Sequence, residues 1–200
     1  MEGLVKHTGT IVVYNEDDID TDRIIPARYL SRVSRSGYGE LLFSDVRGDD
    51  FPLDQDIARG ATILVSGTNF GCGSSREHAV WAIQQAGFRV VIARQDSDSP
   101  GYSDIFRQNA ANCGLLLVEL PSSSHASIVG LGTGATVMID LAEQTVVFDN
   151  EVHSFEINPV VKEQIMAGLD LIGTTLVSTQ EIASFEQAWH SFSPKVEAGQ

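Results

Sequence analysis

The sequence predicts an α/β domain in which helices flank a mixed β-sheet. Short runs of Val, Ile and Leu recur along the chain, as expected of buried strands, and stretches with apolar residues at helical spacing lie between and after them. The chain has 200 residues, of which 42% are hydrophobic, and a chain of this length buries roughly 70% of the surface that its unfolded form exposes. These observations predict a packed core and argue against disorder.

The expected elements follow the apolar runs in chain order. Strands are expected at Thr10–Tyr14, Thr62–Ser66, Arg89–Ala93, Leu115–Leu120, Ala135–Leu141 and Thr145–Asp149. Helices are expected at Arg76–Ala86, Asp104–Asn112, Val160–Gly168 and Thr179–His190. The last two strands flank the polar stretch 142–144, which predicts a hairpin. The order of elements does not indicate a regular series of βαβ units.

Two polar segments are expected to be loops. Ser31–Asp56 is rich in Gly, Ser, Arg and Asp, and Gln95–Ser103 is broken by a Pro-Gly pair. A loop as long as the first is usually functional or mobile. No internal repeat or linker interrupts the chain, so we expect one domain over residues 1–193 and a polar tail over 194–200.

The charge and the cysteine content exclude several classes of protein. A net charge of −14 would repel nucleic acid and an anionic membrane face. The first residues lack a signal-peptide pattern, and no apolar run approaches membrane-spanning length. Cys72 and Cys113 are the only cysteines, and the five histidines are scattered, so no bound metal is expected. These features predict a protein of the reducing cytoplasm.

The segment Thr68–Ala79, here called the glycine-rich turn, lies between an expected strand and an expected helix. Ser74 and Glu77 have the spacing of a helix capping box, which is the structural interpretation. The functional interpretation is a site for a carboxylate-sized anion, because the Gly-x-Gly stretch leaves the backbone open, a helix start offers free amides, and Arg76 offers a bidentate donor. Nucleotide fingerprints do not fit, since a dinucleotide-binding loop would need Gly at position 76 and a Walker loop would need Lys at position 74.

A second cluster, Asp17–Pro26, is here called the acidic turn. An EF-hand loop starting at Asp18 would need Gly at position 23 and Glu at position 29, where the chain has Arg and Tyr. Calcium is therefore excluded. Composition alone favours a solvated acidic turn.

Four stretches of the chain resemble the small subunits of 3-isopropylmalate dehydratase, which correspond to the swivelling domain of aconitases. They are Asp20–Pro26 (DTDRIIP), Arg35–Gly39 (RSGYG), Asn69–Ala79 (NFGCGSSREHA) and Gly168–Gly173 (GLDLIG). The Gly-Ser-Ser-Arg-Glu-His run is the most specific of them. They occur in family order and span most of the chain.

The resemblance implies a swivelling β/β/α domain that closes over a separate large subunit carrying a 4Fe-4S iron–sulfur cluster. It also implies a hydro-lyase of leucine biosynthesis, which converts 2-isopropylmalate into 3-isopropylmalate by removing and re-adding water through isopropylmaleate. This division suits the chain, because two cysteines cannot supply the three that such a cluster uses. The substrate is then a small dicarboxylate, and the alternatives are a related hydro-lyase acting on homoaconitate or citraconate and a non-catalytic anion-binding module.

The resemblance also assigns roles to particular residues. Ser74 matches the base that exchanges the carbon-bound proton, and Asp22 matches an active-site acid. Ser75 and Arg76 match the residues that hold a substrate carboxylate. Arg35 matches a second carboxylate-binding arginine, with Arg32 as the rival position. A helix N-terminus contributes at best about 2 kcal/mol, so it cannot by itself ionise a serine hydroxyl.

Overall fold

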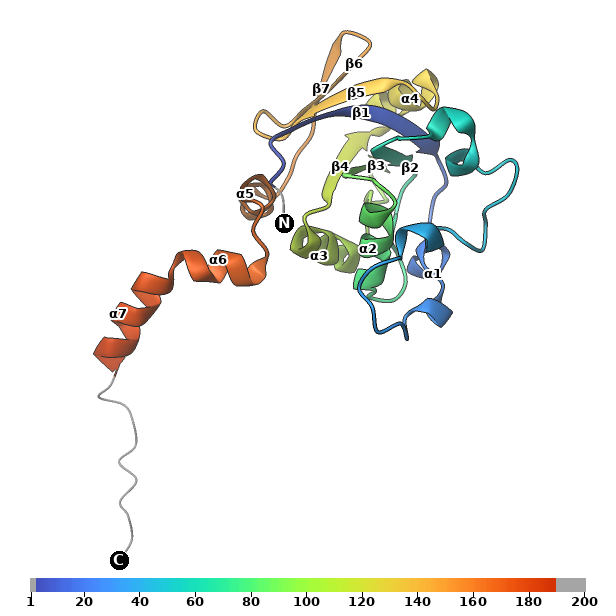
Figure 1. The fold of residues 1–200 in the computed structure, drawn as a ribbon. Coiled ribbons are helices and arrows are strands. Elements are labelled where there is room, and N and C mark those ends of the chain that lie inside the picture. The colour runs from blue at the N-terminus through green and yellow to red at the C-terminus, as the bar shows by residue number, and fades with distance from the viewer. Residues whose placement is uncertain (1–2, 190–200) are drawn as a thin grey trace, which may run out of the picture.

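The computed structural model describes residues 3–189, which form a seven-stranded sheet in the order β4-β3-β2-β1-β5-β6-β7 (Figure 1). The strands are β1 (Lys6–Tyr14), β2 (Ile63–Ser66), β3 (Val90–Gln95), β4 (Leu116–Pro121), β5 (Thr136–Asp140), β6 (Thr145–Phe148) and β7 (Glu151–Ser154). β1 pairs with β2, β2 with β3 and β3 with β4, all in parallel. β1 pairs with β5, β5 with β6 and β6 with β7, all antiparallel. The mixed sheet predicted from the sequence is confirmed.

Helices flank both faces of this sheet, with α2 (Glu77–Gln85) and α3 (Asp104–Cys113) on one side and α4 (Ser122–Leu131) and α5 (Pro159–Ala167) on the other. The short α1 (Thr21–Ile24) follows β1, and α6 (Leu171–Val177) and α7 (Thr179–Trp189) lead away from the sheet (Figure 1). Short 3₁₀ helices occur at Ala27–Tyr29, Gly39–Leu41, Pro52–Asp54 and Asp56–Ala58. The predicted helix end at His190 and the predicted tail over 194–200 lie outside the described residues.

The parallel half of the sheet is more regular than the sequence indicated. Strands β2, β3 and β4 are connected by α2 and α3, so two successive βαβ units form where no such series was expected. All of β2 is buried, as is Val90–Ala93 of β3. Strands covered on both faces are nearly continuous apolar runs, and this explains why their positions were predicted well.

The antiparallel half contains the predicted hairpin and two elements that the sequence did not reveal. β5 and β6 pair around the turn as expected. β7 was missed because its short sequence Glu-Val-His-Ser is largely exposed and shows no apolar alternation. α4 was missed because its serine-rich first turn resembles a loop.

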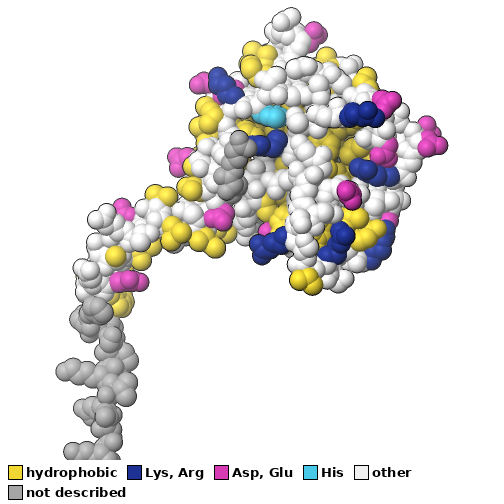
Figure 2. Space-filling view, in the orientation of Figure 1, with side chains coloured by type: hydrophobic (Ala, Val, Ile, Leu, Met, Phe, Trp, Pro, Cys, Tyr) yellow, Lys and Arg dark blue, Asp and Glu magenta, His cyan; other side chains and the backbone are white. Residues whose placement is uncertain are grey.

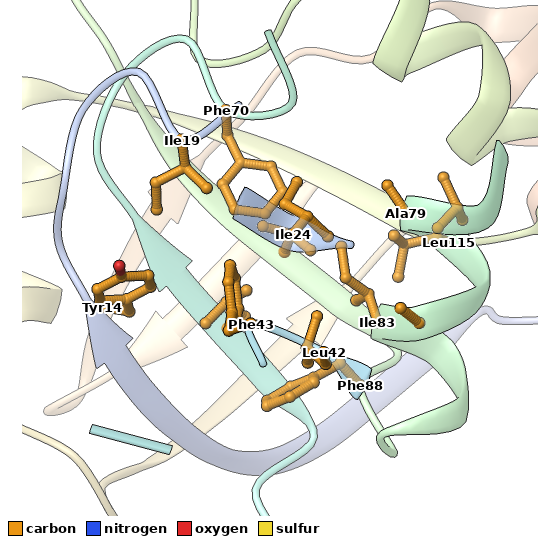
Figure 3. Packing of buried hydrophobic residues seen from close by; sticks show 14 of the residues in the cluster. Tyr14, Ile19, Ile24, Leu42, Phe43, Phe70, Ala79, Ile83, Phe88 and Leu115 are labelled. Atoms are coloured by element: carbon orange, nitrogen blue, oxygen red, sulfur yellow. The ribbon is translucent and has the colours of Figure 1, made fainter. Parts of the chain in front are cut away.

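Each face of the sheet has its own apolar core. The α2 and α3 side uses Val12, Leu64 and Val91 from the sheet, and the α4 and α5 side uses the alternate residues such as Ile11 and Ile63. On the first side, Ile19, Ile24 and Phe70 lie close together beneath the acidic and glycine-rich turns (Figure 3). The two turns are therefore anchored in the core by apolar residues of their own.

Much of the predicted loop Ser31–Asp56 is not an open loop. Tyr38 and Phe43 are fully buried, and Phe51 is 7% exposed. Phe43 and Phe51 both meet the Tyr14 ring edge-on, with centroids 5.2 and 5.0 Å apart. The segment has no strand or α-helix, as predicted for a loop, but its aromatic residues pack into the core: Phe43 and Phe51 against Tyr14 of β1, and Tyr38 against Trp81 of α2. This packing was not predicted, because the aromatic residues have no regular spacing.

The packing of this segment predicts a large effect of Phe43→Ala. Losing a fully buried phenylalanine and leaving a cavity costs about 3–5 kcal/mol, so the free energy of unfolding should fall by that amount in urea denaturation. Val33→Ala is the matched control, because Val33 lies in the same segment but is fully exposed. Equal small effects of both substitutions would contradict the packing described.

Candidate functional site

The site is built where the acidic turn and the glycine-rich turn run side by side. The Gly71 amide donates to the Ile19 carbonyl (2.7 Å), and the Thr21 amide donates to the Cys72 carbonyl (2.9 Å). The buried Thr21 hydroxyl donates to the Ser74 carbonyl at 2.8 Å. These backbone contacts fix the end of the glycine-rich turn against a segment about fifty residues earlier.

The acidic turn is not simply solvated, because most of its carboxylates have structural partners. Asp17 accepts from the Thr68 amide (2.7 Å) and pairs with Arg94 (2.9 Å). The Thr68 hydrogen bond holds the pKa of Asp17 below its usual value. Asp18 accepts from the Asn69 side chain (2.7 Å), and Asp20 caps α1 by accepting from the Arg23 amide (2.7 Å).

Positive backbone angles shape the glycine-rich turn. Gly71 and Gly73 have φ of +75° and +87°, and a Cβ on Gly71 would collide with the Phe106 ring. The 95–103 loop supports the turn from the other side, since the Pro100 and Gly101 carbonyls accept from the amides of residues 69 and 70 (2.8 and 2.9 Å). The turn therefore has backbone partners on two sides.

The capping box expected at Ser74 does not form. α2 begins at Glu77, and its N-cap is Arg76, which makes no side-chain cap bond. Glu77 Oε1 accepts from the Trp81 indole (3.2 Å) instead of reaching back to Ser74. The Thr21 hydroxyl holds the Ser74 carbonyl, and Ser74 lies two residues before the N-cap residue Arg76. Ser74 is therefore not in the capping position. Ser74 is exposed, and no hydrogen bond to its hydroxyl occurs within residues 3–189.

Asp22 and Arg76, both predicted as site residues, form an ion pair. Nη2 donates to Oδ2 at 2.5 Å, and Nη1 lies 2.5 Å from Oδ1. The Arg76 side chain is 11% exposed and that of Asp22 is 57% exposed. The Arg76 hydrogen bond keeps the pKa of Asp22 below its usual value, so the carboxylate is ionised at neutral pH.

Ser75 has a partner that sequence reasoning missed. Its exposed hydroxyl accepts from the Asn109 amide nitrogen of α3 at 3.3 Å. α3 is itself tied to the turn, because the Ser103 hydroxyl donates to the Gly71 carbonyl at 2.6 Å. Because the Ser75 hydroxyl accepts from Asn109, its O–H remains available to donate a hydrogen bond to an incoming anion.

The second predicted carboxylate-binding arginine lies apart from this group. The Arg35 guanidinium stands over the Trp81 ring, 5.4 Å from its centroid, and Arg32 stands over Tyr38 at 5.9 Å. Tyr38 and Trp81 are neighbours, with ring centroids 5.8 Å apart. Neither arginine contacts Ser74 or Arg76 in the described residues, so the choice between them stays open.

The two cysteines of this chain, Cys72 and Cys113, are free thiols and are too few for the three cysteine ligands that the resemblance implies for the cluster. Burial raises the pKa of the Cys113 thiol to about 12, and burial also raises the pKa of Cys72. Within residues 3–189, no three His, Cys, Asp or Glu side chains gather as a metal site. No described helix is long and apolar enough to cross a bilayer.

The arrangement is a candidate for half of an anion site. Two exposed serine hydroxyls lie at the edge of the turn, beside the largely buried Arg76 guanidinium, which is already paired with a carboxylate. Such a surface can bind a carboxylate and position a hydroxyl, but a second surface must cover it to exclude water.

This mixed sheet, with its glycine-rich turn ahead of α2, defines a domain of the aconitase C-terminal type. Residues 1–123 match the family model described as the aconitase C-terminal domain. The chain therefore belongs to that family, among the small subunits of 3-isopropylmalate dehydratase, as the following relatives show.

The small subunit from Bacillus subtilis is 41% identical over 197 residues, which cover 93% of this chain and 96% of the relative. The one from Corynebacterium efficiens is 41% identical over 199 residues, covering 97% and 98%. A crystal structure of 3-isopropylmalate dehydratase (leuD) from Methanocaldococcus jannaschii has a TM-score of 0.66 and 30% identity, covering 90% of this chain and 99% of that one.

Two variants of Thr21 test whether its hydroxyl holds the glycine-rich turn. Thr21→Val keeps the shape but removes the donor to the Ser74 carbonyl, which should lower the free energy of unfolding by about 0.5–1.5 kcal/mol and speed amide exchange in the glycine-rich turn. Thr21→Ser retains the donor and should keep the slow exchange. If both variants exchange alike in urea-free hydrogen-exchange measurements, the hydroxyl does not hold the turn.

Proposed function

We propose that this chain, together with a large subunit, converts 2-isopropylmalate into 3-isopropylmalate by dehydration and rehydration in leucine biosynthesis. The observation that carries the proposal is the edge where the exposed Ser74 and Ser75 lie beside the largely buried Arg76, with Thr21 and Asp22 holding them in place. The family membership of the chain supports the same reaction. A dicarboxylate is the ligand class that such an edge recognises.

Ser74 is proposed as the base that takes and returns the carbon-bound proton. A serine hydroxyl is too weak an acid to ionise unaided, and no group within the described residues hydrogen-bonds to it. Ser74 also lies ahead of the α2 cap, which reduces any help from the helix N-terminus. Its activation is therefore assigned to closure, when water is excluded and the second subunit completes the surroundings.

Arg76 is proposed to exchange partners when substrate arrives. In the free chain Nη2 of Arg76 donates to the Asp22 carboxylate, and the same carboxylate lies against Nη1. A substrate carboxylate has the same geometry and can take that place, with Ser75 donating a further hydrogen bond. Asp22, released from Arg76, then becomes available for the role of active-site acid that the family resemblance assigns to it.

The 4Fe-4S cluster is assigned to the large subunit, and no step assigned to this chain passes through it. Arg35, or Arg32 in its place, is proposed to hold the second substrate carboxylate from the Trp81 side of α2. We also assign the protein to the cytoplasm, where a reducing environment suits two free thiols.

Reconstitution tests the function directly. The full chain mixed with a cognate large subunit carrying its cluster should form and consume isopropylmaleate, followed by absorbance. Comparison of kcat/KM for 2-isopropylmalate with homoaconitate and citraconate decides the substrate within the family. A failure of turnover with every acid, while the large subunit binds, would favour a non-catalytic anion-binding module.

Ser74→Ala should abolish turnover without weakening assembly. The side chain is exposed, and removal of its hydroxyl breaks no hydrogen bond within residues 3–189, so the melting temperature should stay unchanged. Ser97→Ala is the control, because Ser97 is an exposed serine in the 95–103 loop. Turnover at the wild-type rate in the Ser74 variant would refute its role as the base.

Asp22→Asn should free Arg76 in the isolated chain. Removing the competing carboxylate should tighten binding of 2-isopropylmalate about fivefold by calorimetry, since an exposed ion pair is worth up to about 1 kcal/mol after solvent screening. The pKa of Asp22 is lowered in the folded chain. The ion pair therefore stabilises the wild-type fold at pH values above the usual carboxyl pKa, and this stabilisation disappears as the pH falls through the lowered pKa.

The Asp22→Asn variant should lack that acid-dependent loss of stability. Asp45→Asn is the control for ligand affinity, because it removes a carboxylate that pairs with an arginine, Arg28, outside the site. Unchanged ligand affinity in Asp22→Asn would argue against the exchange of partners.

A further inference from the structure

Helices α6 and α7 form an arm that leads away from the body of the molecule (Figure 1). This segment, Leu171–Trp189, is here called the C-terminal arm. No residue of either helix is buried. Hydrophobic side chains lie along it (Figure 2), and the large ones are Leu171, Ile172, Leu176, Val177, Ile182, Phe185 and Trp189, each between 39% and 72% exposed.

The arm has few means of holding its own structure. Its helices have 7 and 11 residues, and isolated helices shorter than roughly 12–15 residues are marginal in water. Local support comes from Asp170, which accepts from the Gly173 amide at 2.6 Å, and from Phe185 against Trp189, with centroids 4.9 Å apart. An exposed apolar surface of this extent marks an interaction site.

The apolar residues of the arm are spaced as helix anchors. On α7, Ile182, Phe185 and Trp189 follow one another by three and four residues, which places them on one face. On α6, Ile172 and Leu176 are four residues apart. This is the spacing of helices that bind in an apolar groove of another protein.

The charge of the arm indicates what kind of surface covers it. The chain has no Lys or Arg between Lys162 and Lys195, whereas Asp170, Glu181 and Glu186 lie on or beside the arm. A second copy would bring the same acidic groups together and a further net charge of −14. Charge complementarity therefore favours a different chain, with an apolar groove and a basic rim.

We propose that the C-terminal arm is the element through which this chain docks onto the large subunit. The Ile182, Phe185 and Trp189 face of α7 lies in an apolar groove of that subunit, and Lys or Arg at its rim face Glu181 and Glu186. The inference rests on the proposed function, because the partner is taken from it. In this proposal the C-terminal arm binds the large subunit, and the glycine-rich turn supplies the residues for catalysis.

The test titrates the full chain into the cluster-bearing large subunit and follows turnover. Combining Ile182→Ser, Phe185→Ser and Trp189→Ser should raise the apparent Kd at least tenfold, leaving the saturated rate and the thermal melt of the chain unchanged. Glu181→Lys with Glu186→Lys should also raise the Kd, with more salt relieving the loss. Val152→Ser is the control, since Val152 is an equally exposed apolar residue on β7 and its Kd should match wild type.

Each other outcome overturns the inference. Wild-type turnover together with an unchanged Kd in the triple variant would remove the arm from the interface and leave the proposed function standing. A wild-type chain that neither binds the large subunit nor turns over would overturn both. Sedimentation showing a wild-type dimer that the triple variant converts into monomer would make a second copy the occupant.

Discussion

The pairing of residues 19–21 with residues 71–74 is the contact on which the site depends. Two backbone hydrogen bonds and the Thr21 hydroxyl join segments that the chain separates by about fifty residues. This pairing fixes the positive φ angles of the glycine-rich turn and keeps the Ser74 side chain pointing outward. The apolar side chains of Ile19 and Phe70, buried directly beneath, make the pairing part of the core.

An acidic protein that handles a dianion must separate its carboxylates from its binding edge. This chain does so by giving most of the carboxylates in the acidic turn a structural role, since Asp17 holds Thr68 and Arg94, Asp18 holds Asn69, and Asp20 caps α1. Asp22 is different, because its partner is Arg76, the guanidinium proposed to bind substrate. On that proposal, the free chain carries a carboxylate of its own in the place of the ligand carboxylate.

Features that depend on local sequence patterns were predicted correctly, and features that depend on contacts between distant segments were missed. The strands of the parallel half were found because burial on both faces leaves continuous apolar runs, and Ser74, Asp22 and Arg76 were singled out by motif. The capping box failed because Ser74 contacts Thr21 rather than Glu77. The folded part of Ser31–Asp56 was missed because aromatic residues without periodicity pack on Tyr14, which lies in another part of the sequence. Asn109 left no signal, since an asparagine within a helix is ordinary until its neighbour is known.

Strand β1 belongs to both halves of the sheet. Lys6–Thr10 pairs with β5 in the antiparallel half, and Ile11–Tyr14 pairs with β2 in the parallel half. The acidic turn follows β1 directly, so one continuous strand runs from the half that carries β5 to β7 to the edge where Asp22 meets Arg76. Because β1 is shared, a rotation of one half of the sheet against the other would bend this strand. Such a rotation would therefore shift the acidic turn that leads into the site.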